Sequence, residues 1–191
     1  MIRLCVYLLP TTIMTDTLDS LHFRPAELGD ASAIACLVNS AYRGDSSRVG
    51  WTTEADLLEG TRIHASEVET IIKSEDAFIL LCQQGENIIG SVQLEHTDDS
   101  AYLGMFVVKP VLQGAGIGKL FMTTAENAVQ ERWGVKKMWM SVISVREELI
   151  AYYERRGYVR TGRFKPFPVE DFDSELLVPE LQFEEMEKDL A

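Results

Sequence analysis

The sequence predicts an α+β fold: a mixed, mostly antiparallel sheet of six to seven strands with helices on both of its faces. Runs rich in β-branched and aromatic residues recur along the chain and are bounded by short turns with Gly or Asp. Between several of them, apolar residues repeat every three to four positions, as on the buried face of a helix. No internal repeat or low-complexity linker interrupts this order, which predicts one domain over residues 21–191 after an N-terminal extension, residues 1–20.

The composition of the 191-residue chain is that of an ordinary globular protein, with 46% hydrophobic and 25% charged residues. A chain of this length buries roughly 70% of its unfolded surface, so we expect a core that needs no disulfide and no structural metal. The formal net charge of −12 argues against a nucleic-acid partner or an anionic membrane surface. Such a charge suits a cationic small substrate better.

The three cysteines, Cys5, Cys36 and Cys82, are widely spaced and form no C-x-x-C pair, so neither a disulfide framework nor a zinc site is indicated. We therefore expect a cytoplasmic location and no bound metal. The apolar stretch within Met1–Pro10 is too short to span a membrane and lacks the cleavage site of a signal peptide.

The first predicted elements are a strand, Leu21–Arg24, and an amphipathic helix that Asp30 caps. Gly44 ends this helix. A Thr-x-x-Asp pattern then predicts a short helix over residues 53–58, with a stop at Gly60.

The middle of the chain changes from helical to strand-like periodicity. Ser66 and Glu69 form a Ser-x-x-Glu capping box, which predicts a helix to about Ser74. Two β-rich runs follow, Ala77–Cys82 and Asn87–Leu94, and the glycine-containing turn between them predicts an antiparallel hairpin.

A third β-rich run, Tyr102–Val108, is closed by Pro110. A glycine-rich segment separates it from an amphipathic helix that begins near Leu120 and ends near Gly134. Another strand is expected over Lys137–Ile143.

The last predicted helix begins at a second Ser-x-x-Glu box, at Ser144, and ends at Gly157. Two strands complete the chain, Tyr158–Phe164 and Leu181–Lys188. The acidic, proline-punctuated segment between them, residues 166–179, is expected to be a solvated loop.

The most informative segment is the glycine-rich turn between a strand and a helix, residues 107–119. Its glycines allow the backbone to approach a ligand closely, and the N–H groups at the helix start form an anion site, here for a phosphate. A Walker A loop does not fit, because Gln113 and Leu120 stand where that loop needs Gly and Ser or Thr. A dinucleotide fingerprint does not fit either, because the glycines are spaced G-x-G-x-G.

The turn instead has the pattern Q-x-x-G-x-G from Gln113, with V-x-P before it from Val108, and a Y-E-R-R-G-Y segment begins at Tyr153. The two motifs, in this order and at this distance, resemble those of the GNAT superfamily of N-acetyltransferases. The resemblance covers about residues 21–165. It implies an acyltransferase that moves an acetyl group from acetyl-CoA to a primary amine of a small molecule or protein. A turn that packs a helix and binds nothing is the alternative.

The resemblance also implies how acetyl-CoA would be held as co-substrate. Backbone N–H groups of the turn would bind its pyrophosphate, and the preceding strand, which splays from its neighbour in that family, would pair with the pantetheine arm. The N–H of Phe106 would meet the oxyanion. The candidate coenzyme-binding residues are Phe106, Val107, Val108, Gln113, Gly114, Ala115, Gly116, Ile117, Gly118 and Lys119.

For catalysis, the resemblance assigns to Tyr153 the protonation of the coenzyme A thiolate, although a core tyrosine would have the same sequence context. The amine must be neutral, and holding a lysine-like amine neutral at pH 7 costs about 4 to 5 kcal/mol. The glutamate that many family members have on the strand before the turn is missing. Glu95 is the candidate general base, with His96 beside it. Alternatively, these two residues are only an exposed charge pair at the end of a hairpin, or the amine enters already neutral and needs no base.

The chain departs from the family at Arg146, where an asparagine is frequent. A group of basic residues near the C-terminal motif could contact the 3′-phosphate of the coenzyme or an acidic substrate group, or simply be solvated: Arg155, Arg156, Arg160, Arg163 and Lys165.

The acceptor pocket is expected around residues 42–62 and 164–172, with Arg48, Trp51 and Glu54 as candidate substrate-binding residues. A buried tryptophan and a helix cap would explain the same residues. Two other functions remain open: an acetyl-CoA sensor without turnover, and an acyltransferase with another acyl chain or acceptor. A homodimer is also open, because late strands of this fold often pair between subunits.

Overall fold

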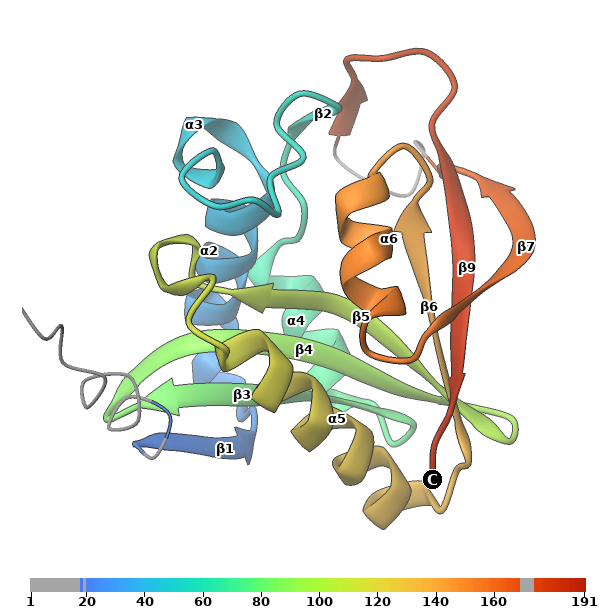
Figure 1. The fold of residues 1–191 in the computed structure, drawn as a ribbon. Helices are drawn as coiled ribbons and strands as arrows, with labels where there is room; N and C mark the ends of the chain where they lie inside the picture. Colours follow the sequence, from blue (N-terminus) through green and yellow to red (C-terminus); the bar gives the residue numbers. More distant parts are fainter. Residues whose placement is uncertain (1–17, 19, 169–173) are drawn as a thin grey trace, which may run out of the picture.

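The computed structural model describes residues 18, 20–168 and 174–191, and nearly all of the predicted N-terminal extension lies outside them. The central feature is a mixed, mostly antiparallel sheet of seven strands in the order β1-β3-β4-β5-β6-β9-β7 (Figure 1). Its strands are β1 (Leu21–Pro25), β3 (Ala77–Gln84), β4 (Asn87–Thr97), β5 (Ser100–Val108), β6 (Lys137–Ile143), β7 (Val159–Pro166) and β9 (Gln182–Asp189).

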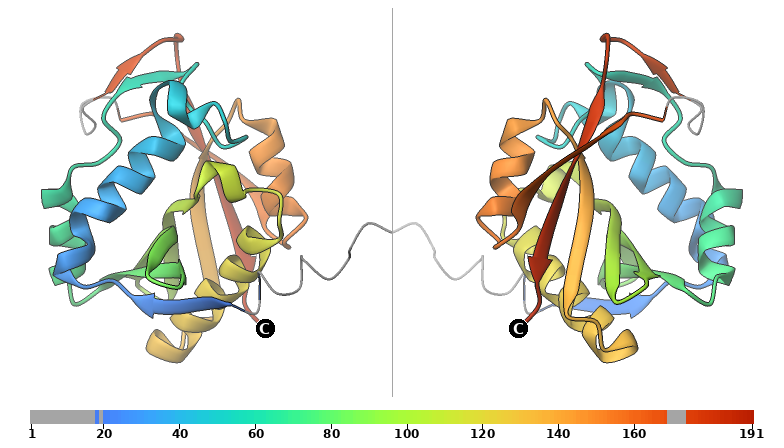
Figure 2. Two further views of the ribbon diagram at one scale, coloured as in Figure 1. Left: turned by 90° about the vertical axis from the view of Figure 1, so that its left-hand side faces the viewer. Right: turned by 90° about the vertical axis from the view of Figure 1, so that its right-hand side faces the viewer.

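Helices cover both faces of this sheet (Figure 2). They are α2 (Ala31–Tyr42), α3 (Gly44–Ser47), α4 (Ala65–Lys73), α5 (Ile117–Trp133) and α6 (Glu147–Glu154), with 3-10 turns η1 (Leu28–Asp30) and η2 (Pro110–Leu112). Leu80 and Cys82 of β3 pack in the core under α5 and α6, whereas Ile79 and Leu81 pack under α2 and α4. Successive residues of a strand face opposite sides, so one apolar run supplies both cores. Within the described residues, no helix is long and apolar enough to cross a membrane.

The end of β5 diverges from β6. Among the described residues, only Ala101 and Tyr102 of β5 pair with β6, in parallel. On its other side β5 pairs with β4, but the register shifts near Met105, whose φ of 47° lies in the left-handed region. A bulge of this kind bends the strand locally. The sheet therefore opens between β5 and β6 on the side where the glycine-rich turn follows.

The predicted fold class is confirmed, but the short helix predicted over residues 53–58 is wrong. Residues 55–57 form a turn, and Leu58 begins strand β2 (Leu58–Gly60), which pairs antiparallel with β8 (Ser174–Leu176). The carbonyl of Glu54 accepts the N–H groups of Leu57 and Leu58, both at 2.9 Å, so a single turn forms before the chain enters β2, and the N–H of Glu54 donates to the distant carbonyl of Tyr42 at 3.0 Å. Strand β8 lies in the segment predicted as a loop, of which residues 169–173 are outside the described residues.

The sequence predicts α4 and α6 in the right places but misplaces their first residues. The N-cap of α4 is His64, which forms a capping box with Glu67. The N-cap of α6 is Arg146. Ser144 lies two residues before this N-cap, and its backbone N–H donates to the carbonyl of Gln182 of β9 at 2.8 Å.

Candidate active site

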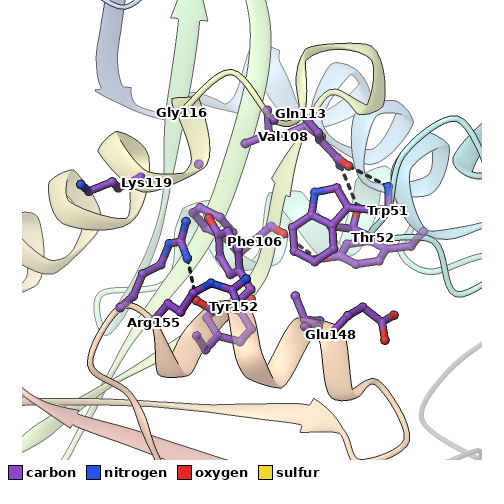
Figure 3. A pocket seen from close by; sticks show the side chains of 16 residues that line it. Trp51, Thr52, Phe106, Val108, Gln113, Gly116, Lys119, Glu148, Tyr152 and Arg155 are labelled. Atoms are coloured by element: carbon purple, nitrogen blue, oxygen red, sulfur yellow. Dashed lines mark hydrogen bonds between the residues drawn. The ribbon is translucent and has the colours of Figure 1, made fainter.

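A cavity of about 450 Å³ lies beside the end of β5, between the glycine-rich turn and α6. We call it the turn cavity. In Figure 3, Gln113 extends toward the loop that carries Trp51 and Thr52, whereas Tyr152 and Glu148 project from α6 on the opposite side. The cavity thus joins three segments that are far apart in the sequence.

The glycine-rich turn presents bare backbone to this cavity. Gly114 and Gly116 have φ values of 84° and 85°, a conformation that favours glycine, and Gly116 is the N-cap of the 17-residue helix α5. No described atom lies within 4 Å of the position that a Cβ on Gly114 would take. Free N–H groups and the helix dipole favour an anion here, and Lys119 adds a positive charge to the lining.

The side chain of Gln113 has a different role from the backbone around it. Its amide nitrogen donates to Oγ1 of Thr52 at 2.9 Å and to the carbonyl of Val108 at 3.0 Å, and its amide oxygen accepts the N–H of Trp51 at 3.0 Å. A Cβ on Gly50 would lie 2.8 Å from that oxygen. The side chain therefore fastens the turn to the loop before β2 and leaves ligand contacts to the backbone.

The other predicted coenzyme-binding residues divide by the direction of their side chains. Phe106 and Val108 line the turn cavity, as do Gly114, Gly116, Gly118 and Lys119. Val107 points to the opposite face and packs in the core with α2. Ile117 is buried in the core under α5, and Ala115 packs against that core. Only the backbone of these last three residues can face a ligand.

Tyr153 stands at the deep end of the turn cavity. Its side chain is 6% exposed, and burial, reinforced by the neighbouring Tyr42 and Tyr152, raises its pKa well above the usual value of 10.0. The hydroxyl therefore keeps its proton at neutral pH. Tyr42 lies against the same wall and donates its hydroxyl hydrogen to the carbonyl of Phe106 at 2.7 Å.

The mouth of the turn cavity is framed by the aromatic rings of Trp51 and Tyr152. Trp51 packs against Tyr152, with ring centroids 5.1 Å apart. The guanidinium of Arg156 lies 3.2 Å from the centroid of the same tyrosine ring. The sequence predicts Trp51 as a site residue but not Tyr152, which directly precedes the Y-E-R-R-G-Y segment without being part of it.

A second cavity of about 70 Å³, which we call the inner cavity, meets the turn cavity at four side chains that line both: Tyr42, Phe106, Leu149 and Tyr153. Glu54, Arg62 and Arg146 also line it. Glu54 is bonded to Arg43 through one carboxylate oxygen and to Arg146 at 3.4 Å through the other. The predicted substrate-binding residue Glu54 is thus inside a cavity, held by two buried arginines.

Glu95 lines neither of these cavities. It lies opposite Tyr102 in the β4–β5 ladder, and Gln93 donates to its carboxylate at 3.5 Å. Gln93 and Tyr102 line a more open hollow of about 390 Å³, which we call the outer hollow and which meets the inner cavity at Arg62. Glu95 itself does not line this hollow either; only its neighbours Gln93 and Tyr102 do, and His96 stacks on Trp133.

Most of the predicted basic residues do not belong to the site. Arg48 is 46% exposed and paired with Asp45 and Asp56 outside both cavities, so the structure does not support it as a substrate contact. On β7, Arg160 pairs with Glu184, and Arg163 pairs with Glu185 and Glu187, all on β9. Of the five residues near the C-terminal motif, Arg155 and Arg156 line the turn cavity.

No metal site is visible in the described part of the chain, where no three His, Cys, Asp or Glu side chains gather as ligands. Cys36 and Cys82 are both free thiols, the first exposed and the second buried. Burial raises the pKa of Cys82 to about 12, so this thiol is not ionised at neutral pH.

Comparison with known proteins places the chain among acetyltransferases. The model of the acetyltransferase (GNAT) family matches residues 39–158, which include the glycine-rich turn and the C-terminal motif. No curated protein matches the sequence.

Solved structures share the fold at low identity. A ribosomal-protein alanine N-acetyltransferase from Escherichia coli is 15% identical over 90% of this chain and 94% of that one, with a TM-score of 0.66. A spermidine N-acetyltransferase chimera that includes the Vibrio cholerae enzyme is 19% identical over 89% and 95%, with a TM-score of 0.64. An N-acetyltransferase from Staphylococcus aureus is 11% identical over 88% and 97%, with a TM-score of 0.65.

Proposed function

Because the chain belongs to the acetyltransferase (GNAT) family, it is an acyltransferase that acts on amines, and we propose that acetyl-CoA bound in the turn cavity supplies the acetyl group. One observation carries this proposal. A single cavity is lined both by the glycine-rich turn and by the buried side chain of Tyr153. Acetyl-CoA carries its phosphates at one end and its reactive thioester at the other. The cavity correspondingly has an anion site at the turn and a candidate catalytic residue at Tyr153.

The turn would bind the pyrophosphate through backbone N–H groups from Gly114 to Gly118, since the N–H of Gln113 already donates to the carbonyl of Pro110 at 3.3 Å. Lys119 would add a positive charge, and Arg155 or Arg156 could meet a further phosphate of the coenzyme. The pantetheine arm would lie along Phe106–Val108, where β5 has left β6. Support for this course comes from the open sheet edge and from the two side chains that line the cavity there.

The chemical step requires a neutral amine, which attacks the carbonyl carbon so that a carbon–nitrogen bond forms and the carbon–sulfur bond breaks. The N–H of Phe106 would stabilise the negative charge that develops on the carbonyl oxygen. Tyr153 would donate its proton to the departing sulfur. The position of Tyr153 in the lining of the turn cavity supports this role. Burial raises its pKa, which keeps the phenol protonated but makes it a weaker acid, so the proton would move only as negative charge develops on sulfur.

The proton of the amine needs an acceptor, and Glu95 is our candidate. Its carboxylate lies beside Gln93, which lines the outer hollow, so water in that hollow would connect the base to the acceptor. Direct contact with the amine is not supported, because Glu95 lines neither the turn cavity nor the inner cavity.

We further propose that the enzyme acts in the cytoplasm, as the spacing of its cysteines suggests, and that its acceptor is a small molecule or peptide rather than nucleic acid. A homodimer would pair at β7. This strand is an edge of the sheet, and its Val159 and Phe164 are exposed.

Thermal unfolding in the presence of acetyl-CoA, coenzyme A, ATP or NAD tests the proposal. A ligand at 100 times its dissociation constant adds about 2.7 kcal/mol to stability, so the transition temperature should rise with the first two ligands only. Equal stabilisation by ATP would indicate a general phosphate site. No shift with acetyl-CoA at saturating concentration would refute the assignment of the turn cavity.

A further inference from the structure

The hydroxyl of Tyr152 lies against the first turn of α5. A Cβ on Gly118, the second residue of that helix, would be 2.7 Å from the hydroxyl oxygen and 3.8 Å from the ring carbon that bears it. Both residues line the turn cavity. A side chain at position 118 would displace the hydroxyl, whereas glycine lets it approach the helix. The hydroxyl of a residue on α6 is therefore beside the backbone N–H groups that form the anion site.

The ring of Tyr152 is held in place by its neighbours. The guanidinium of Arg156 lies 3.2 Å from the ring centroid, and the ring centroids of Trp51 and Tyr153 lie 5.1 Å and 5.4 Å from it. These contacts restrict the rotation of the side chain. A group that is already ordered loses little conformational entropy when a ligand binds, so its hydrogen bond contributes more to affinity.

The hydrogen of this hydroxyl is not used elsewhere in the described part of the chain, where it is donated to no acceptor. Burial raises the pKa of Tyr152 above the usual value of 10.0, although the charges of Arg156 and Arg155 oppose this shift. The hydroxyl therefore keeps its proton at neutral pH. It can donate a hydrogen bond to a ligand in the turn cavity.

The lining around Tyr152 favours an anion as that ligand. Lys119, Arg155 and Arg156 line the turn cavity, and Glu148 is the one carboxylate among its described lining residues. Neither arginine forms an ion pair with a carboxylate in the residues that the structure describes. Positive charge from α6 therefore adds to that of the helix dipole of α5 on the opposite side of the cavity.

We propose that Tyr152 binds the coenzyme directly, by donating its hydroxyl hydrogen to an oxygen of the pyrophosphate at the start of α5. This inference rests on the proposed binding of acetyl-CoA in the turn cavity and adds a side chain from α6 to the backbone contacts of the turn. The pyrophosphate is then held from both sides. Because hydrogen bonds to charged oxygens are stronger than those between neutral groups, a single hydroxyl has a measurable effect on affinity.

Tyr152→Phe removes the hydroxyl and keeps the ring between Trp51 and Arg156. We expect the dissociation constant of coenzyme A, measured by calorimetry, to rise about tenfold or more, the effect of losing one hydrogen bond to a charged group. Tyr158→Phe removes a hydroxyl that lies in the core and does not line the turn cavity, so it should leave this constant unchanged. An unchanged constant in Tyr152→Phe would overturn the inference, and so would tighter binding, which would show that the hydroxyl obstructs the site.

The contact with Gly118 predicts that the two positions are coupled. Gly118→Ala should push the hydroxyl away from the turn and weaken the binding of coenzyme A. In the Tyr152→Phe background the same alanine meets no hydroxyl, and the closest remaining atom of that ring is 3.8 Å away. The double variant should therefore bind coenzyme A about tenfold more tightly than the product of the two single effects predicts. Effects that simply multiply would contradict the proposal.

Phosphorus NMR of bound coenzyme A identifies the phosphate that meets the hydroxyl. The pyrophosphate resonances should differ between the native protein and Tyr152→Phe, and the 3′-phosphate resonance should not. A change confined to the 3′-phosphate, or no change, would overturn the inference. If coenzyme A does not bind the native protein, the proposed function itself fails; if it binds the native protein and Tyr152→Phe equally well, only the role of Tyr152 is refuted.

Discussion

The side-chain amide of Gln113 lies 2.9 Å from Oγ1 of Thr52, and this bond joins the glycine-rich turn to the loop before β2. The same amide also donates to the carbonyl of Val108 and accepts the N–H of Trp51. One side chain thus connects the expected phosphate site, the strand beside it and the aromatic mouth of the turn cavity. The shape of the cavity depends on it.

Replacing this glutamine should weaken coenzyme binding without unfolding the protein. Gln113→Glu keeps the acceptor for Trp51 but loses both donated bonds and adds a negative charge beside the anion site. We expect the dissociation constant of coenzyme A to rise by about tenfold, since hydrogen bonds of this kind contribute about 0.5–1.5 kcal/mol each. Gln130→Glu, which loses one exposed bond to the carbonyl of Ala191, should leave it unchanged. Equal affinities by calorimetry would contradict the role of Gln113.

Substitutions at two glycines with the same backbone conformation distinguish an effect on stability from an effect on coenzyme binding. Gly116 and Gly134 have φ values of 85° and 68° at the two ends of α5, and no described backbone crowds either position. An alanine in this conformation costs about 1–2 kcal/mol, so both variants should melt at lower temperature. Only Gly116→Ala should also lose affinity for coenzyme A, because only Gly116 lines the turn cavity. Equal loss of affinity in both would argue against the turn as the phosphate site.

Buried tyrosines should make the protein sensitive to alkali. Burial raises the pKa of Tyr42, Tyr153 and Tyr158 in the folded state, and the carboxylate of Glu126 adds to the effect on Tyr158. Below pH 10, the approximate pKa of a tyrosine in the unfolded chain, the folded and unfolded states both keep the proton. These groups therefore do not change the free energy of unfolding in that range. Above it the unfolded state ionises first, and each group lowers the free energy of unfolding by up to about 1.4 kcal/mol per pH unit.

Denaturant titrations from pH 7 to strongly alkaline pH would measure this slope. Tyr158→Phe should reduce the slope of the free energy of unfolding against pH by the contribution of about one proton. The variant should also be less stable, because the hydroxyl of Tyr158 bonds to Glu126 at 3.1 Å. The chain has six tyrosines, so phenolate absorbance equivalent to more than three of them while the protein is still folded would show that these three hydroxyls are not buried from solvent.

The sequence was sufficient to predict the sheet, four of the helices and the glycine-rich turn, because these depend on local periodicity and on glycine positions. It could not show that Glu54 would be bonded to Arg146, since 92 residues separate them and only the packing of α6 against the loop before β2 brings them together.

The proposed role of Glu95 as the general base predicts both a loss of rate on substitution and the way that loss depends on pH. Glu95→Gln should lower kcat at neutral pH and leave the KM for acetyl-CoA unchanged, because this side chain lies outside the turn cavity. The defect should shrink as pH rises, since a larger fraction of the amine then arrives neutral and needs no base. His96→Gln tests the neighbouring side chain, which stacks on Trp133, and should behave like the native enzyme. A pH-independent defect in Glu95→Gln would point to a structural role.

Tyr153→Phe removes one hydroxyl and keeps the ring that packs against Tyr152 and Tyr158. Acid catalysis typically contributes about 10²–10⁴-fold, so we expect kcat to fall within that range. Thermal stabilisation by coenzyme A should persist, because the turn that binds it is intact.

Tyr158→Phe is the matched control, since its hydroxyl contacts Glu126 and Met138 in the core and does not line the turn cavity. It should lower stability and leave kcat nearly unchanged. If Tyr153→Phe retains native turnover, the proton must reach sulfur from another group or from water, and the raised pKa of Tyr153 would then reflect its burial alone.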